Sequence, residues 1–338
     1  MLGFYDAVLP GSRELELVEL MLSQPITVGE RSITLSSCIG AVNRPHSLNF
    51  AEMRKVGAFA RKQAEERGHT NNIVLYDDDL FRAAQDRDKI ARLLQEALDM
   101  DDFLVFYQPQ VDLHKNEVVG YEALVRMRDR AYPPAQFIPV AEVTGLITEV
   151  DRVVTKRAIE LLSVWKRRKK RMRPISINFS SVHLTRGDDF AAYLLDLLDT
   201  YGVPSEYIRV EVDESLFSSE NQQNAEEMVR RLFDAGISIA LDNFGKGCSA
   251  FTDIMAIPAS VIKIDKEFVD TFLVDGHDQN FEQLVRLAHG LGRKVVVVGV
   301  DKRWQIEACR SLNCDVVQGY YFSKPLLPEN AVQYKPRP

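Results

Sequence analysis

Two adjacent oxygen-bearing side chains follow an apolar run in the stretch Ile239–Cys248. Asp242 and Asn243 come directly after that run and before a glycine-containing loop. Neighbouring residues at the end of a strand point in different directions, so each of these two can reach a different ion or atom. Only Asp242 carries a charge. The stretch predicts a ligand site at a strand end with one charged and one neutral ligand.

Further polar residues stand at or just after other apolar runs. A lone carboxylate of this kind is usually a solvated surface group, but a series in phase on successive strand ends favours a shared site. Carboxylate and amide oxygens are the ligands that Mg²⁺, Mn²⁺ and Ca²⁺ prefer, so the series predicts a site for a hard divalent cation. Its members are Glu122, Asn178, Glu214, Asp242, Asn243, Lys263 and Asp265.

The elements that must position these residues alternate in type from residue 103 onward. Such alternation predicts a barrel of strands surrounded by helices, with the functional residues at the carboxyl ends of the strands. We therefore expect an α/β, TIM-like (β/α)8 barrel. Strands are predicted at 103–111, 118–124, 175–179, 208–212, 237–241, 261–264, 295–298 and 315–317, and helices at 150–170, 189–200, 222–235, 279–291 and 302–311.

The first hundred residues have a different pattern. Strands are predicted at 26–28, 32–41 and 72–76, with a helix at 49–66, which gives a small α+β domain. Apolar spacing over 80–98 predicts another helix. The expected domains are therefore 1–80, a linker helix at 81–100, and the barrel at 101–338.

Composition narrows the class of protein. The chain has 338 residues, a formal net charge of −7 and four cysteines without the paired spacing of a zinc site. These values predict a cytoplasmic protein with reduced thiols, no membrane segment in this chain and no nucleic-acid partner. The basic run Lys166–Arg173 favours a solvated helix end, and contact with a membrane surface or a partner is the alternative.

The barrel segment resembles the EAL domain family. The resemblance is carried by a series of dispersed motifs in the family's order, which makes it specific. They are Tyr107-Gln-Pro109, Glu122-Ala-Leu124 with Arg126, Phe137–Glu142, Asn178 with Ser180, Glu214-Ser215, the Asp242 loop, Lys263-Ile-Asp265, Gln318-Gly-Tyr320 and Lys324-Pro325. The resemblance implies a TIM-like barrel that hydrolyses cyclic di-GMP with two divalent metals, although some members bind the nucleotide or a protein without turnover.

By this resemblance the first metal site would consist of Glu122, Asn178, Glu214 and Asp242. The family's catalytic lysine corresponds to Lys263, with Glu122 as the other catalytic position. The second site departs from the family. Asn243 stands where the family has an aspartate, Val298 where it has a glutamate, and Asp301 where it has another glutamate. We therefore expect one Mg²⁺, Mn²⁺ or Ca²⁺ at most, with the second metal site lost.

The nucleotide-binding residues implied by the resemblance are largely present. They are Gln108, Leu124, Arg126, Asn178, Asp242, Asp265, Gln318 and Pro325. The glycine loop reads Lys246, Cys248 and Ala250 where the family has small polar or aromatic residues. Closure of that loop over a ligand, and its coupling to dimerisation, are therefore expected to differ.

The N-terminal segment resembles the second half of a GGDEF domain. Ala7–Gly11 is similar to the stretch after that family's signature, but Met1–Tyr5 stands where the signature would be. Because the signature is absent, we expect no cyclase activity.

The expected function is therefore that of a degenerate GGDEF–EAL regulator, which binds cyclic di-GMP or a regulatory protein without efficient hydrolysis. A homodimer is a further expected assembly. Two alternatives stay open: a weak cyclic di-GMP phosphodiesterase that releases linear pGpG, and a protein-interaction module that binds no nucleotide.

Overall fold

The computed structural model describes residues 13, 17–18, 20–21, 24, 26–28, 31–33, 38–42, 49–66, 72–76, 78–128, 132–218, 222–244, 257–272 and 279–336. The chain divides into two compact units, Met1–Ile90 and Ala91–Pro338. The division falls inside helix α3 (Asp78–Asp99), which covers most of the predicted linker helix. None of the helices in these described ranges combines the length and the apolar character that crossing a membrane requires.

The first unit contains two small pairs of strands. β1 (Ile26–Val28) and β2 (Arg31–Ile33) form an antiparallel hairpin, whereas β3 (Cys38–Ala41) pairs in parallel with β4 (Asn72–Leu75). The prediction of one strand over 32–41 is wrong. β2 and β3 belong to different sheets, and the parallel partner of β3 is reached only through the crossover helix α2 (Phe50–Glu66).

A capping box explains where α2 begins. Asn49 accepts a hydrogen bond from the Glu52 backbone N–H (3.0 Å), and Glu52 accepts one from the Asn49 N–H (2.8 Å). The resemblance of this unit to a GGDEF domain stays a prediction, and the Met1–Gly11 stretch that carries part of it lies outside the described residues.

The second unit is a closed barrel, and the prediction of an α/β, TIM-like barrel is confirmed. Its strands follow one another around the barrel in chain order, from β5 to β12. β5 runs antiparallel to both of its neighbours, and the other strand pairs are parallel. The strands are β5 (Phe103–Asp112), β6 (Glu117–Met127), β7 (Ile175–Phe179), β8 (Ile208–Asp213), β9 (Ser238–Asp242), β10 (Val261–Ile264), β11 (Lys294–Val298) and β12 (Val316–Gln318).

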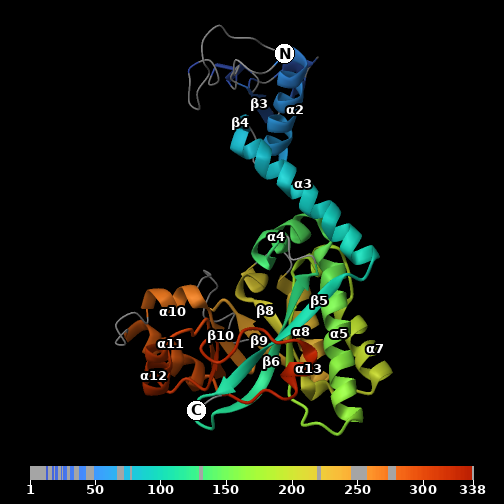
Figure 1. Cartoon of the computed structure of the whole chain (residues 1–338). Coiled ribbons are helices and arrows are strands. Elements are labelled where there is room, and N and C mark those ends of the chain that lie inside the picture. Colours follow the sequence, from blue (N-terminus) through green and yellow to red (C-terminus); the bar gives the residue numbers. More distant parts are fainter. Residues whose placement is uncertain are drawn as a thin grey trace. The chain divides into compact units, whose positions relative to one another are not determined.

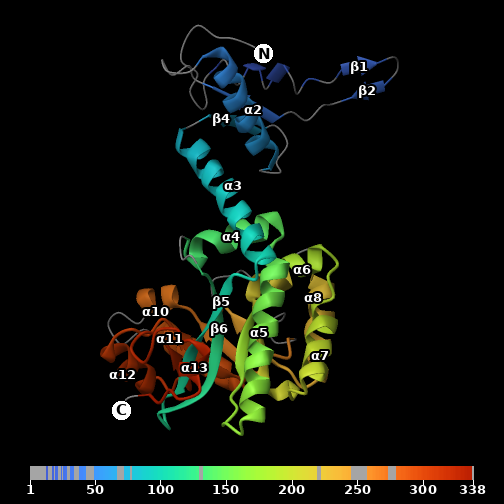
Figure 2. The same ribbon diagram turned by 45° about the vertical axis from the view of Figure 1, so that its right-hand side comes forward.

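Helices cover the outside of the barrel. In both views α5 and α7 lie on one side of the strands, and α10, α11 and α12 lie on the other (Figure 1 and Figure 2). The helices and 3₁₀ turns are α4 (Pro134–Thr144), α5 (Ile147–Arg167), α6 (Val182–Thr185), α7 (Phe190–Tyr201), η1 (Ser205–Tyr207), η2 (Glu214–Ser218), α8 (Gln222–Asp234), α10 (Lys266–Phe272), α11 (Gln279–Gly290), α12 (Arg303–Ser311) and α13 (Pro328–Ala331).

The basic run is exposed where α5 ends. Part of it is tied to the barrel: the Lys166 ammonium donates to the Gly202 carbonyl (2.5 Å), and Arg171 pairs with Glu117 (3.1 Å). These contacts agree with a solvated helix end. The alternative of a membrane or partner contact stays a prediction.

The interior of the barrel contains an apolar cluster as well as polar side chains. Ala240, Val261, Val296 and Val316, from β9 to β12, form an apolar cluster. On β8 the apolar and charged residues alternate. Val210 and Val212 are fully buried on one face of the strand, and Arg209 and Glu211 lie on the other face. Since helices cover the outer face, the charged face of β8 points into the barrel.

Candidate functional site

Cross-strand pairing places polar residues of the barrel beside residues of the neighbouring strands. Such neighbours lie about 5 Å apart, so their side chains can share ligands. The register pairs are Gln108 with Glu122, Asn178 with Glu211, Asp213 with Asp242, and Val298 with Gln318.

Lys263 is the centre of this cluster. It is 2% exposed, and its ammonium group donates hydrogen bonds to Glu122 (3.3 Å) and to Glu211. The Asp242 carboxylate lies 3.6 Å away. Burial alone would lower the pKa of Lys263, but the three carboxylates raise it above its ordinary value. The lysine is therefore a fixed cation surrounded by acidic groups.

Glu122 is held ionised by its neighbours. Gln318 donates to one of its oxygens (2.6 Å) and Asn178 to the other (3.2 Å). Burial would raise the pKa of Glu122, yet the charge of Lys263 and these hydrogen bonds hold the pKa below its ordinary value. The structure thus brings together Glu122, Asn178, Lys263 and Gln318, as the sequence predicts.

Glu211 is a member of the cluster that sequence reasoning missed. Burial, together with repulsion from Glu122, raises its pKa to about 7. Its Oε1 atom is buried and has no hydrogen-bond partner among the described residues. The predicted Glu214 lies three residues further along, at the start of η2. Its role as a metal ligand stays a prediction, whereas Glu211 is the glutamate seen to contact Lys263.

The donor set matches one hard divalent cation in its chemistry. Glu122, Glu211 and Asp242 supply carboxylate oxygens, Asn178 supplies an amide oxygen, and the unpartnered Glu211 Oε1 is available to a ligand. Over the described ranges, no group of three or more His, Cys, Asp and Glu side chains is arranged to hold a metal ion. The carboxylates converge on Lys263 instead, so a dication would share them with this ammonium group.

The positions of the family's second metal site do not match such an ion. Asn243, in a left-handed conformation (φ 55°), donates through its amide to Asp213 (2.7 Å). Val298 packs against the apolar cluster inside the barrel. Neither side chain offers a negative charge, and the amide nitrogen of Asn243 already donates to a carboxylate.

Asp301, the remaining carboxylate on that side, is also engaged. One of its oxygens accepts from Lys266 (2.9 Å) and the other from the Tyr320 N–H (2.9 Å). Burial would raise the pKa of Asp301, but these hydrogen bonds and the charge of Lys266 keep it below its ordinary value.

Two of the residues predicted to bind a nucleotide lie on the same strand as Glu122. Leu124 and Arg126 follow Glu122 on β6 with the same alternation, and both are partly exposed. Burial lowers the pKa of Arg126, whose guanidinium donates to the Val125 carbonyl (2.7 Å). Two backbone hydrogen bonds between Tyr107 and Leu326 (2.8 and 2.9 Å) hold the Pro325 segment beside β5.

Asp265 and the glycine loop stand apart from the cluster around Lys263. Asp265 accepts a hydrogen bond from the Phe268 N–H (3.0 Å) and so caps α10, and its ligand role stays a prediction. Lys246, Cys248 and Ala250 of the glycine loop lie outside the described residues.

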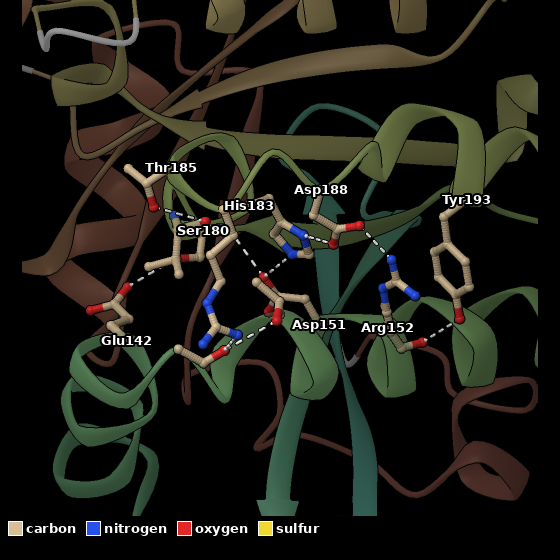
Figure 3. A network of polar contacts seen from close by, with 12 residues as sticks. Glu142, Asp151, Arg152, Ser180, His183, Thr185, Asp188 and Tyr193 are labelled. Carbon is tan, nitrogen blue, oxygen red and sulfur yellow. Dashed lines mark hydrogen bonds and ion pairs between the residues drawn. The ribbon is translucent and has the colours of Figure 1, made fainter.

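A second polar network stands behind the segment that follows β7 (Figure 3). His183 is fully buried, and its two ring nitrogens face Asp188 (2.7 Å) and Asp151 (3.2 Å). Asp151 also accepts from the Ser180 N–H (3.2 Å), and the Ser180 hydroxyl reaches Glu142 (3.4 Å). The network therefore fixes the backbone two residues beyond Asn178. Ser180 and Glu142 belong to motifs named in the sequence, whereas Asp151, His183 and Asp188 belong to none of them.

The fold and the site define an α/β barrel with one reversed strand and an acidic cluster around a buried lysine. The chain belongs to the EAL domain family, whose model matches residues 91–325.

Comparison with known proteins supports this assignment. The oxygen sensor protein DosP of Escherichia coli (strain K12) is 29% identical over 315 residues, which cover 90% of this chain and 38% of DosP. The cyclic di-GMP phosphodiesterase NbdA of Pseudomonas aeruginosa is 29% identical over 315 residues, which cover 90% of this chain and 39% of NbdA. The chain thus spans well under half of the length of these curated relatives.

Solved structures include the same barrel. The PaMucR phosphodiesterase in complex with c-di-GMP has a TM-score of 0.67 and 26% identity, covering 72% of this chain and 99% of that one.

Proposed function

We propose that the barrel binds cyclic di-GMP, or presents the same surface to a regulatory protein, without efficient hydrolysis. The observation that carries the proposal concerns the two positions, Asn243 and Val298, at which the family has carboxylates for a second metal ion. There Asn243 donates to Asp213, and Val298 packs against an apolar cluster. Two-metal phosphodiester hydrolysis needs two ions about 3.5 to 4 Å apart, and neither residue helps to hold a second dication.

Two residues predicted to contact the nucleotide have side chains suited to that role. Arg126 offers a planar guanidinium to a phosphate group, and Gln108 offers an amide to a base. NbdA is named as a cyclic di-GMP phosphodiesterase, and PaMucR was solved with c-di-GMP. These features favour the same ligand here.

One divalent cation would be held by Glu122, Asn178, Glu211 and Asp242. Such an ion supplies Lewis-acid stabilisation of phosphate charge. In this chain Lys263 already balances part of the acidic charge, so we infer that nucleotide binding does not strictly require the ion.

A weak phosphodiesterase is the second candidate, and the intact cluster around Lys263 is the observation that favours it. Losing one charge-stabilising group commonly slows a reaction by about 10²- to 10³-fold. With two carboxylates replaced, we expect residual turnover at most.

Calorimetry with cyclic di-GMP, with and without Mg²⁺, tests the nucleotide-binding proposal. We expect saturable binding in both conditions, and we expect Arg126→Met to weaken it about tenfold or more through loss of a charge-assisted phosphate contact. The matched control is Arg128→Met, which removes an exposed arginine that directly follows the same strand. No heat at high ligand concentration would refute nucleotide binding and favour a protein-interaction module.

A further inference from the structure

A chain of hydrogen-bonded side-chain amides, here called the relay, crosses the barrel interior. Arg209 donates through Nη1 to Gln110 Oε1 (3.2 Å), and Gln110 donates to Gln318 Oε1 (3.1 Å). Gln318 then donates to Gln108 Oε1 (3.1 Å) and to Glu122 (2.6 Å). The chain thus connects a partly buried cation on β8 to the carboxylate at the candidate site.

The two ends of this chain fix its direction. A guanidinium can only donate, and an ionised carboxylate can only accept. Turning all the amides around would set donors against Arg209 and a carbonyl oxygen against Glu122. The direction therefore follows from the chemistry of the ends, even though the oxygen and nitrogen of a glutamine are otherwise interchangeable in shape.

Arg209 is well suited to impose this direction. In the described part of the chain no carboxylate lies within ion-pair distance of it, and its other hydrogen bond goes from Nε to Ser238 Oγ (3.3 Å). Gly120, the cross-strand partner of Gln110, leaves room for the relay, because a Cβ there would stand 3.0 Å from Gln110 Oε1.

We infer that Arg209 is a positioning residue that sets the donor and acceptor directions of Gln110, Gln318 and Gln108. Gln318 thereby presents its N–H groups to Glu122 and to the Gln108 oxygen. The amide nitrogen of Gln108 in turn donates to the Ser323 carbonyl (3.3 Å). Gln108 then faces a ligand as a donor. On the proposed function, this selects an acceptor atom of the nucleotide, a phosphate or base carbonyl oxygen.

Hydrogen exchange of the Gln318 side-chain amide, followed by NMR on the full chain without ligand, tests the inference. Arg209→Gln can donate or accept, so the relay loses its fixed end. We expect exchange to accelerate about tenfold, the equivalent of one buried hydrogen bond. Arg209→Lys keeps a donor-only cation and should restore slow exchange. Ser238→Ala removes the other contact of Arg209 and should leave the exchange unchanged.

A second variant separates direction from simple packing. Gln110→Glu still accepts from Arg209 but cannot donate to Gln318, so two acceptors face each other and the Gln318 amide should exchange faster. The inference is overturned if Gln110→Glu leaves the Gln318 exchange unchanged, or if Arg209→Lys and Arg209→Gln affect it equally. Because no nucleotide enters this experiment, a failure of cyclic di-GMP binding would count against the proposed function alone.

Discussion

At the scale of single residues, Lys263 balances charges that would otherwise be buried without compensation. Removing one member of a buried ion pair commonly costs about 3 to 5 kcal/mol. We therefore expect Lys263→Met to lower the free energy of unfolding by that amount in metal-free buffer, measured by urea denaturation. Added Mg²⁺ should recover part of the loss, because a dication can replace the ammonium charge.

Lys294→Met is the control, since Lys294 is an exposed lysine on the neighbouring strand β11. It should change stability by no more than about 0.5 kcal/mol. Equal losses in the two variants, or no effect of Mg²⁺ on Lys263→Met, would contradict this account of the cluster.

A second residue-scale prediction concerns acid sensitivity of the His183 network. Burial would raise the pKa of Asp188, but contacts with His183 and Arg152 hold it below its ordinary value. The ionised form therefore stabilises the fold, fully so above the unfolded pKa of about 3.9, and this contribution disappears as pH falls through the lower folded pKa.

We expect Asp188→Asn to be destabilised by about 1.5 to 3 kcal/mol at neutral pH, since hydrogen bonds to a charged group are lost. Urea denaturation of both proteins over a pH series should show this difference shrinking below about pH 4. A difference that stays constant down to acid pH would show that the charge of Asp188 is not responsible.

Glu211 shows why part of the site could not be read from the sequence. Arg209, Glu211 and Asp213 alternate with apolar residues, a pattern typical of a strand with one solvated face. In the barrel that face points inward, because helices cover the other. The strand ends were identifiable from their apolar runs, whereas the sequence does not say which side of a strand faces a polar interior. The sequence also does not give the strand register that places Glu211 beside Asn178 of β7.

At the scale of elements, the pairing of β11 with β12 positions Gln318. The N–H groups of Gly299 and Val300 both donate to the Gln318 carbonyl (2.8 and 3.2 Å). A Cβ on Gly319 would overlap the Val300 carbonyl oxygen. The close approach of the two segments therefore requires glycine at 319.

Gly319→Ala should separate these segments, with a loss of about 1 to 3 kcal/mol from overpacking and a weaker affinity for cyclic di-GMP. Thermal unfolding and calorimetry measure the two effects. Gly290→Ala is the control, because a Cβ there meets open space. If Gly319→Ala behaves like Gly290→Ala, the close approach does not constrain the site.

The predicted elements were accurate where buried runs are long and uniform. β7, β10 and the helices α7, α8, α11 and α12 were predicted to within a residue or two. α4 was missed because it contains Pro139 and begins at the second of two consecutive prolines, features that usually argue against a helix. Pro134 occupies the first helical turn, where its missing N–H costs nothing.

At the scale of the whole molecule, the barrel should gain stability from its ligand. A ligand at 100 times its dissociation constant stabilises a protein by about 2.7 kcal/mol. Cyclic di-GMP should therefore raise the melting temperature of the barrel unit, with or without Mg²⁺, and cyclic di-AMP should have a smaller effect. A thermal shift that depends entirely on Mg²⁺ would contradict the idea that Lys263 balances the site.

The central claim is that Asn243 and Val298 prevent efficient hydrolysis in an otherwise assembled EAL site. The most direct measurement compares the rate of cyclic di-GMP cleavage by the wild type with that of the double variant Asn243→Asp/Val298→Glu, in saturating Mg²⁺ or Mn²⁺. Restoring both carboxylates should increase turnover by about 100-fold or more, the usual effect of one charge-stabilising group. A wild-type rate close to that of the double variant would contradict the account.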